Sequence, residues 1–291
     1  DGDTLGCAFA LCAILKKLGK KRAFCCADPI TADFSFLTEG FSDDEVKKPF
    51  VVAVDVAAEK LLGPLCEEYG GRIDLCIDHH SSNTMYAANN YVEDRAAACE
   101  IIYELALELG VKIDRYIRNC IYTGLSTDTG CFRYQNTTAS VFRVAAELME
   151  QGIDSQKINK LMFETKTKTS LRLEMLARET LEYHFGGKCA VITVTQDMYK
   201  KSGSNEHECY PITALPRQIE GVLAGAVIKE KDDGSFGISV RTEEGIDASE
   251  ICARLGGGGH KGAAGASFDS DYETGKNALL DSIKLSLDGI L

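Results

Sequence analysis

Two short apolar segments of the sequence each end in residues that can bind a metal ion. The run 73–77 leads into Asp78-His79-His80, and the run 50–54 leads into Asp55. Such runs predict buried strands. If the strands are parallel, their carboxyl ends meet at one edge of the sheet, where open α/β folds bind ligands. Carboxylates combined with imidazoles, with few thiols nearby, suit Mn²⁺, Mg²⁺ or iron better than structural zinc. We therefore expect a metal site at this edge.

Further acidic residues extend this group. Asp1 and Asp3 open a predicted helix, and Asp128 is expected in a loop of small residues after another helix. Any one of them would ordinarily be only a helix cap or the first residue of a turn. Two cations about 3.5–4 Å apart need a bridging carboxylate and several terminal ligands. The joint occurrence of these acids with the 78–80 motif therefore favours a two-metal site that polarises a phosphoryl group. Neighbouring histidines on a strand face opposite sides, a restriction that relaxes at a strand-to-loop junction.

A second group of residues, near the C-terminus, suggests phosphate binding. Four glycines, 256–259, precede His260, and their backbone N–H groups can cradle a phosphate. The alternative is a flexible linker, which is disfavoured because the run leads directly into a predicted strand. Arg241, ending another predicted strand, is a candidate partner for that phosphate, and an ordinary exposed arginine is an equally good interpretation. For Arg133, a substrate phosphate and a neighbouring acid are equally good partners.

Composition limits the protein class and its partners. The chain has 291 residues, 45% of them hydrophobic and 26% charged, which is typical of a globular protein of about two domains. The net charge of −12 argues against a grip on long duplex DNA, which needs a basic face. Twelve cysteines without a CxxC pair favour buried thiols in a reduced, cytoplasmic setting. No apolar stretch approaches a membrane span, so we expect no membrane partner, and the start of the sequence has no signal-peptide pattern.

The hydrophobic periodicity predicts alternating strands and helices, and therefore a parallel sheet. Helices are expected over 3–18, 59–69, 98–109, 114–125, 138–150, 248–255 and 272–287. Strands are expected over 22–27, 50–54, 73–78, 189–194, 222–229, 236–241 and 264–268, with a hairpin turn at 232–234. The resulting organisation is a metal-binding domain over 1–152, a helical connector over 153–185 and a second domain over 186–291.

These motifs resemble those of the DHH phosphoesterases that also carry a DHHA1 domain. Four motifs occur in the family's order: Asp1-Gly2-Asp3-Thr4-Leu5-Gly6, Asp55, Asp78-His79-His80 and Thr127-Asp128-Thr129-Gly130. The segment 256–265 resembles the DHHA1 nucleic-acid-binding signature. The resemblance implies an α/β fold with a parallel-sheet DHH domain, a smaller α/β DHHA1 domain and an active site in the cleft between them.

The resemblance also implies roles for individual residues. Two divalent cations, most commonly Mn²⁺ with Mg²⁺ as the alternative, would be held by Asp1, Asp3, Asp55, His79 and Asp128, and Asp55 would bridge them. The catalytic residues would be Asp55, Asp78, His79 and His80, with Asp78 orienting a ligand. The substrate-binding candidates are His80, Arg133, Arg241, Gly257, Gly258, Gly259 and His260.

The two-domain size is similar to that of the bacterial nanoRNase and pAp phosphatase group. This implies a Mn²⁺-dependent phosphodiesterase and phosphatase that acts on very short oligoribonucleotides and 3′-phosphoadenosine 5′-phosphate (pAp). A cyclic or linear dinucleotide phosphodiesterase is the alternative enzyme, and a catalytically silent nucleotide-binding protein is the alternative of another class. The family motif begins with a strand and a histidine that would lie before residue 1. The family usually has Ser at the position of Cys7, and we expect this change to affect only packing. The sequence does not decide whether the protein forms a homodimer.

Overall fold

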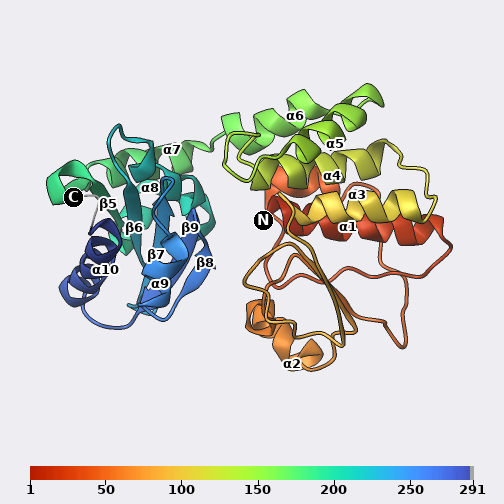
Figure 1. Cartoon of the computed structure of the whole chain (residues 1–291), viewed down its shortest axis with the longest axis horizontal. Coiled ribbons are helices and arrows are strands. Elements are labelled where there is room, and N and C mark those ends of the chain that lie inside the picture. Colours follow the sequence, from red (N-terminus) through yellow and green to blue (C-terminus); the bar gives the residue numbers. More distant parts are fainter. Residues whose placement is uncertain (289–291) are drawn as a thin grey trace. The chain divides into compact units, whose positions relative to one another are not determined.

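The computed structural model describes residues 1–288, which form two compact units, Asp1–Thr165 and the part from Lys166 onward (Figure 1). Each unit is described by itself. The predicted boundaries at 152 and 185 lie on either side of this division, and the predicted position of the active site in a cleft stays a prediction. Among residues 1–288, no helix is long and apolar enough to cross a membrane.

The first unit contains a parallel sheet with the strand order β1-β2-β3. Its strands are β1 (Val52–Val54), β2 (Leu75–Asp78) and β3 (Asn89–Val92). The register pairs Val54 with Ile77 and Asp78 with Val92. Asp55 and Asp78 therefore emerge at the same carboxyl edge, as the sequence predicted.

Helices bury the core of this unit. They are α1 (Gly2–Lys17), α2 (Cys66–Tyr69), α3 (Ala98–Glu108), α4 (Arg115–Asp128), α5 (Ala139–Glu150) and α6 (Ser155–Asn159), with the short helices η1 (Ala32–Leu37), η2 (Glu59–Leu65) and η3 (Lys160–Glu164). Most of α1 is buried, including Phe9 and Ile14, because it packs against α3 and α4. Gly6 permits this packing, since a Cβ there would lie 2.5 Å from the carbonyl oxygen of Cys120.

The second unit is built on a six-stranded mixed sheet with the order β4-β5-β6-β7-β9-β8. Its strands are β4 (Glu182–His184), β5 (Cys189–Val194), β6 (Ala224–Glu230), β7 (Phe236–Thr242), β8 (Gly258–His260) and β9 (Ala263–Phe268). Its helices are α7 (Lys168–Arg178), α8 (Gln196–Ser202), α9 (Ala248–Ala253) and α10 (Tyr272–Leu287), with the short helices η4 (Phe185–Gly187), η5 (Glu206–Ala214) and η6 (Pro216–Gln218).

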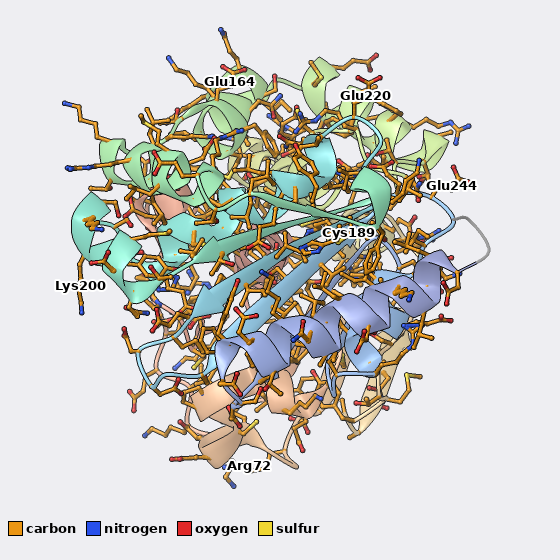
Figure 2. All side chains as sticks on the ribbon, turned by 90° about the vertical axis from the view of Figure 1, so that its left-hand side faces the viewer. Arg72, Glu164, Cys189, Lys200, Glu220 and Glu244 are labelled. Atoms are coloured by element: carbon orange, nitrogen blue, oxygen red, sulfur yellow. The ribbon has the colours of Figure 1, made fainter. Side chains whose placement is uncertain are left out.

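Each face of this sheet has its own core. Alternate strand residues such as Val191 and Val240 pack with α9 and α10, and their neighbours such as Ile192 pack with α7, α8 and η5. Figure 2 shows α10 lying across one face of the sheet. The structure confirms the predicted α/β class and the hairpin between β6 and β7.

Several predicted elements differ from the structure. The strand predicted over 22–27 is wrong, because the backbone N–H groups of Arg22 and Phe24 are bound by the carboxylates of Asp44 and Asp43 instead of a neighbouring strand. The helix predicted over 59–69 is interrupted at Gly63, whose φ of +56° is non-helical and which precedes a proline. Strand β3 was not predicted, and the predicted connector contains α6, η3, α7 and β4.

Candidate metal centre

Asp55 follows β1 in an unusual backbone conformation. Its φ is +58°, in the left-handed region that residues other than glycine seldom occupy, and its N–H donates to the carbonyl of Ile77 at 2.9 Å. Oδ2 accepts a hydrogen bond from the Thr4 hydroxyl at 2.7 Å. Oδ1 is buried and accepts no hydrogen bond within residues 1–288. Backbone strain of this kind concentrates at functional sites, and Oδ1 is the candidate ligand atom.

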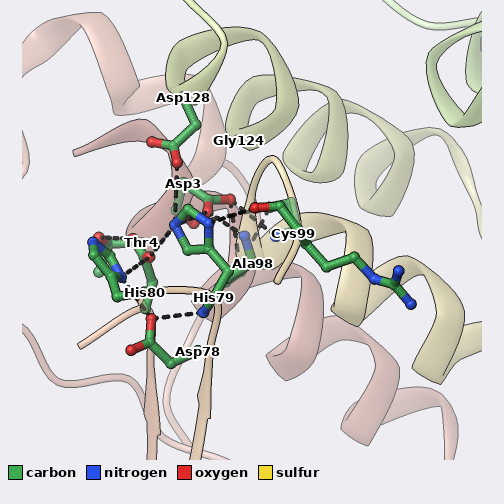
Figure 3. Close-up of polar contacts among 12 residues, drawn as sticks. Asp3, Thr4, Asp78, His79, His80, Ala98, Cys99, Gly124 and Asp128 are labelled. Carbon is green, nitrogen blue, oxygen red and sulfur yellow. Dashed lines mark hydrogen bonds and ion pairs between the residues drawn. The ribbon is translucent and has the colours of Figure 1, made fainter. Parts of the chain in front are cut away.

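Asp3 lies in the first turn of α1 with its side chain fully buried. Its Oδ2 accepts from the N–H of Ala98 at 2.6 Å and its Oδ1 accepts from the N–H of Cys99 at 3.0 Å (Figure 3). These N–H groups begin α3, have no partner within that helix and favour a negative charge. Burial, followed by the carboxylates of Asp55 and Asp128, nevertheless raises the pKa of Asp3 well above its usual range. A cation beside Asp3 would reverse that effect.

His79 directs one ring nitrogen at three carboxylates. Its Nε2 lies 3.2 Å from Oδ2 of Asp128, 3.4 Å from Oδ1 of Asp55 and 4.0 Å from Oδ2 of Asp3. Nδ1 lies 3.0 Å from the carbonyl oxygen of Arg95, which fixes the ring as a donor at that atom. Burial alone would lower the pKa of His79, but the contacts with Asp128 and Asp55 outweigh it and raise the pKa to about 12. The imidazolium therefore offsets part of the negative charge of the cluster, and a metal ion can take the place of the Nε2 proton.

Asp78 orients its neighbours. Its Oδ1 lies 2.7 Å from Nδ1 of His80 and accepts from the backbone N–H of His79 at 2.8 Å, and its Oδ2 accepts from Nδ2 of Asn83 at 2.6 Å. Burial would raise the pKa of Asp78, but the hydrogen bonds from His80 and Asn83 hold it below its usual value. Sequence reasoning missed Asn83, because an asparagine in a Ser- and Asn-rich turn is ordinary turn chemistry.

Asp128 is the last residue of α4 and not part of a loop as predicted. The hydroxyls of the preceding polar residues bond back to carbonyls of the same helix, so they are satisfied without interrupting it. Thr127, for example, donates to the carbonyl of Thr123 at 2.8 Å. The end of α4 brings the Asp128 carboxylate to Nε2 of His79 (Figure 3).

These side chains form two overlapping groups of metal-ligand atoms. Within residues 1–288, mutual distances of at most 4.8 Å join Asp3, His79 and Asp128 in one group, and Asp55, Asp78, His79 and His80 in another. Oxygen and imidazole donors suit Mn²⁺ or Mg²⁺. Mutually repelling carboxylates and the buried Oδ1 of Asp55 fit a divalent cation. The residues present therefore fit a divalent metal centre.

In the first unit, two predicted residues lie outside these groups. Asp1 is the N-cap of α1 and accepts the N–H of Asp3 at 2.8 Å. Arg133 is exposed, its Nε donates to the carbonyl of Gly130 at 2.6 Å, and its guanidinium lies 6.0 Å from the centre of the Phe163 ring. The roles of Asp1 in metal binding and of Arg133 in substrate binding stay predictions.

The second unit places Arg241 and His260 in one row of its sheet. Arg241 pairs with Ala263 of β9, and Ala263 pairs with His260 of β8. Directly opposite residues of neighbouring strands share a face, so both side chains stand on the face away from the buried Val240 and Ala264. Two strand spacings, roughly 10 Å, separate their backbones.

The glycine run 256–259 covers the end of a loop and the beginning of the edge strand β8. Gly257 precedes β8, and Gly258, Gly259 and His260 form that strand. A Cβ on Gly257 would lie 2.1 Å from the Gly265 carbonyl oxygen, and one on Gly259 would lie 2.6 Å from Cα of Ala264. These glycines therefore allow the backbone of the edge strand to approach β9 closely.

Comparison with known proteins establishes the family. Residues 1–125 match the model described as "DHH family, N-terminal domain", and residues 186–287 match that of the DHHA1 domain. The chain belongs to the DHH family and carries a DHHA1 domain.

Its relatives include two bacterial proteins named "Bifunctional oligoribonuclease and PAP phosphatase NrnA". The protein from Thermus thermophilus is 31% identical over 99% of this chain and 87% of its own length. The protein from Bacillus subtilis is 26% identical over 93% of this chain and 87% of its own length. A crystal structure of an exopolyphosphatase-related protein from Bacteroides fragilis matches with a TM-score of 0.86 and 21% identity, covering 98% of this chain and 88% of that one. That likeness shows the fold.

Proposed function

We propose that this chain is a metal-dependent phosphoesterase that hydrolyses very short oligoribonucleotides and removes a phosphate from pAp. The observation that carries the proposal is the convergence of the buried side chains of Asp3, Asp55 and His79 with the partly buried side chain of Asp128. Phosphoryl transfer is accelerated by preorganised cations that offset the negative charge of the phosphoryl group. This cluster brings together ligands that would hold such cations. The names of relatives that span nearly the whole chain support the substrate class.

The proposed cofactors are two divalent cations, Mn²⁺ first and Mg²⁺ as the alternative. Asp3, Asp55, His79 and Asp128 would hold them, and Asp55 would be shared, since its Oδ1 is buried, accepts no hydrogen bond within residues 1–288 and lies 3.4 Å from Nε2 of His79. Bound cations of this kind supply Lewis acidity and a hydroxide near neutral pH.

His80 is proposed to contact the substrate phosphate. Its Nδ1 is engaged with the Asp78 carboxylate, which Asn83 holds from the other side. This arrangement fixes the ring orientation and tautomer, so that Nε2 is the atom presented to the substrate. Asp78 and Asn83 would therefore act through His80 as positioning residues.

Arg241 and His260 are proposed to hold the part of the substrate that does not react. Arginine binds a phosphate through two parallel hydrogen bonds, and a spacing of roughly 10 Å along a sheet is of the order of a nucleotide with its phosphate. Ala263, which lies between them, and the glycines of β8 have small or no side chains, so a base or sugar could approach the backbone of the sheet there.

A substrate panel tests the proposal. The chain is stripped of metal with a chelator, Mn²⁺ or Mg²⁺ is restored, and hydrolysis of pAp, of RNA of two and five nucleotides, and of cyclic dinucleotides is measured. We expect metal-dependent hydrolysis of pAp and of the short RNA. Asp128→Asn should be inactive, whereas Asp197→Asn, at an exposed residue of α8 paired with Lys201, is the matched control.

Two outcomes would overturn the proposal. Preferential hydrolysis of cyclic dinucleotides would assign the chain to the dinucleotide phosphodiesterases. Nucleotide binding in calorimetry without hydrolysis of any substrate, at saturating metal, would identify a catalytically silent nucleotide-binding protein.

A further inference from the structure

Two thiols contact the buried carboxylate of Asp3. Sγ of Cys7, in α1, lies 3.6 Å from Oδ1 of Asp3 and 3.4 Å from Sγ of Cys99, in α3. All three side chains are fully buried, and both cysteines are free thiols. Their ligand atoms lie within 4.8 Å of one another. The sequence predicted that Cys7 affects only packing, but these contacts give it the surroundings of a ligand.

The spacing of these donors is close to that around a tetrahedral cation. Zinc binds oxygen at about 2.0–2.2 Å and sulfur at about 2.3 Å, so tetrahedral geometry separates a sulfur ligand from an oxygen ligand by about 3.6 Å and two sulfur ligands by about 3.8 Å. Cys7 Sγ and Asp3 Oδ1, 3.6 Å apart, match the first of these separations, whereas the two sulfurs are 3.4 Å apart. The two sulfurs must therefore move apart by about 0.4 Å for the three donors to share one ion.

A glycine makes room for this donor set. A Cβ on Gly124 of α4 would lie 2.3 Å from Oδ1 of Asp3 and 2.3 Å from Sγ of Cys99. Any side chain at this position would occupy the space beside the donors. In Figure 3, Gly124, Asp3 and Cys99 are neighbours.

We propose that Asp3, Cys7 and Cys99 form an additional cation site that takes a thiophilic divalent cation, Zn²⁺ or Cd²⁺. Thiolates select such ions, whereas Mn²⁺ and Mg²⁺ prefer oxygen donors. Binding converts the two thiols into thiolates and releases their two protons to solvent. The site shares Asp3 with the metal centre and in this respect rests on the proposed function: a thiophilic ion draws Asp3 away from Mn²⁺ and inhibits hydrolysis.

Titration with Cd²⁺ tests the site without an activity readout, because cadmium thiolates absorb in the near ultraviolet. The full chain is used in a background in which the exposed Cys25 and Cys26 are serine. Cys7→Ser and Cys99→Ser are the test variants. Cys12→Ser is the matched control, because Cys12 is a buried thiol of the same helix that is outside the donor set.

We expect the background protein to bind Cd²⁺ with a thiolate absorption band. Cys7→Ser and Cys99→Ser should each lower the affinity by about tenfold or more, the order of loss seen when the surroundings of a metal ligand are disturbed, and Cys12→Ser should leave it unchanged. Mn²⁺ binding, followed by electron paramagnetic resonance, should persist in Cys7→Ser.

The proposal is overturned if the band is absent from the background protein, or if it persists in the Cys7→Ser/Cys99→Ser double variant. Loss of Mn²⁺ binding in Cys7→Ser would also overturn it, because the thiol would then only support Asp3. Absent hydrolysis of every substrate would contradict the proposed function and leave the Cd²⁺ result intact, so the two failures are distinguishable.

Discussion

Replacing Asp55 by Asn removes the charge of this side chain and keeps its shape, so the substitution separates the role of the charge in metal binding from the role of the side chain in the fold. The φ of +58° at this position is better tolerated by Asn than by other residues with a side chain, and the amide has the shape of the carboxylate. The remaining side-chain oxygen can still accept the hydrogen bond from Thr4. The Asp55 charge raises the pKa of Asp3 and also that of His79, so its removal relieves the repulsion with Asp3 and weakens the attraction to the His79 imidazolium, two effects of opposite sign. We therefore expect the metal-free variant to be as stable as the parent.

Metal binding should respond much more strongly. At a Mn²⁺ concentration one hundred times its Kd, the parent gains about 2.7 kcal/mol. For a unit of 165 residues, 1–165, this corresponds to a rise in Tm of about 5–10 °C. A hundredfold loss of affinity in Asp55→Asn would leave only about 0.4 kcal/mol, or a rise of roughly 1 °C, at the same concentration.

Thermal unfolding with and without Mn²⁺ measures this difference, and hydrolysis of a two-nucleotide RNA gives the catalytic consequence. Because metal activation contributes several kcal/mol, the rate should fall by about 10³-fold. Asp197→Asn is again the control. Activity within about tenfold of the parent, or an undiminished Mn²⁺-induced rise in Tm, would refute the bridging role of Asp55.

Three further predictions concern the substrate and the pH. Arg241→Ala and His260→Ala should raise KM or lower kcat/KM with metal occupancy unchanged, and loss of metal in either variant would mean that the unit assignments are wrong. Because a net charge of −12 disfavours the binding of a long strand, kcat/KM should fall steeply from RNA of about two to five nucleotides to roughly 20-mers, and equal cleavage of 20-mers would indicate a processive nuclease. The pKa of His79, raised from 6.5 to about 12, means that its imidazolium stabilises the metal-free fold fully below about pH 6.5 and progressively less as the pH rises toward 12. Mn²⁺ must displace this proton, so its affinity should rise by up to about tenfold per pH unit, and calorimetry in buffers of different ionisation enthalpy should detect the released proton. Proton-free binding between about pH 6.5 and 8.5 would contradict the assignment of His79 as a ligand.

Local patterns in the sequence were sufficient to predict the carboxyl edge of the parallel sheet and the acidic residues that lie there. The runs ending at Asp55 and Asp78 predicted two strands whose carboxyl ends meet, and the structure confirms both. The hairpin at 232–234 and the helices α5 and α10 were also predictable, because a turn triplet and a period of 3.6 residues are properties of neighbouring residues. Prediction failed over 22–27, where side-chain carboxylates replaced a neighbouring strand as partners of the backbone.

The chemistry of the metal centre depends on contacts between segments far apart in the chain. Asp3 was predicted to open a helix and to bind a metal ion, but its hydrogen-bond partners were not predicted. It lies in the first turn of α1 and accepts hydrogen bonds from the first N–H groups of α3, about ninety-five positions later. No local pattern encodes that contact, because it depends on how α1 packs against α3 and α4. The same packing brings Cys7 to Cys99. The sequence by itself determined which residue types stand at the strand ends; the tertiary structure alone decided which of their atoms face one another, because side-chain direction follows from register, backbone φ and the packing of distant helices.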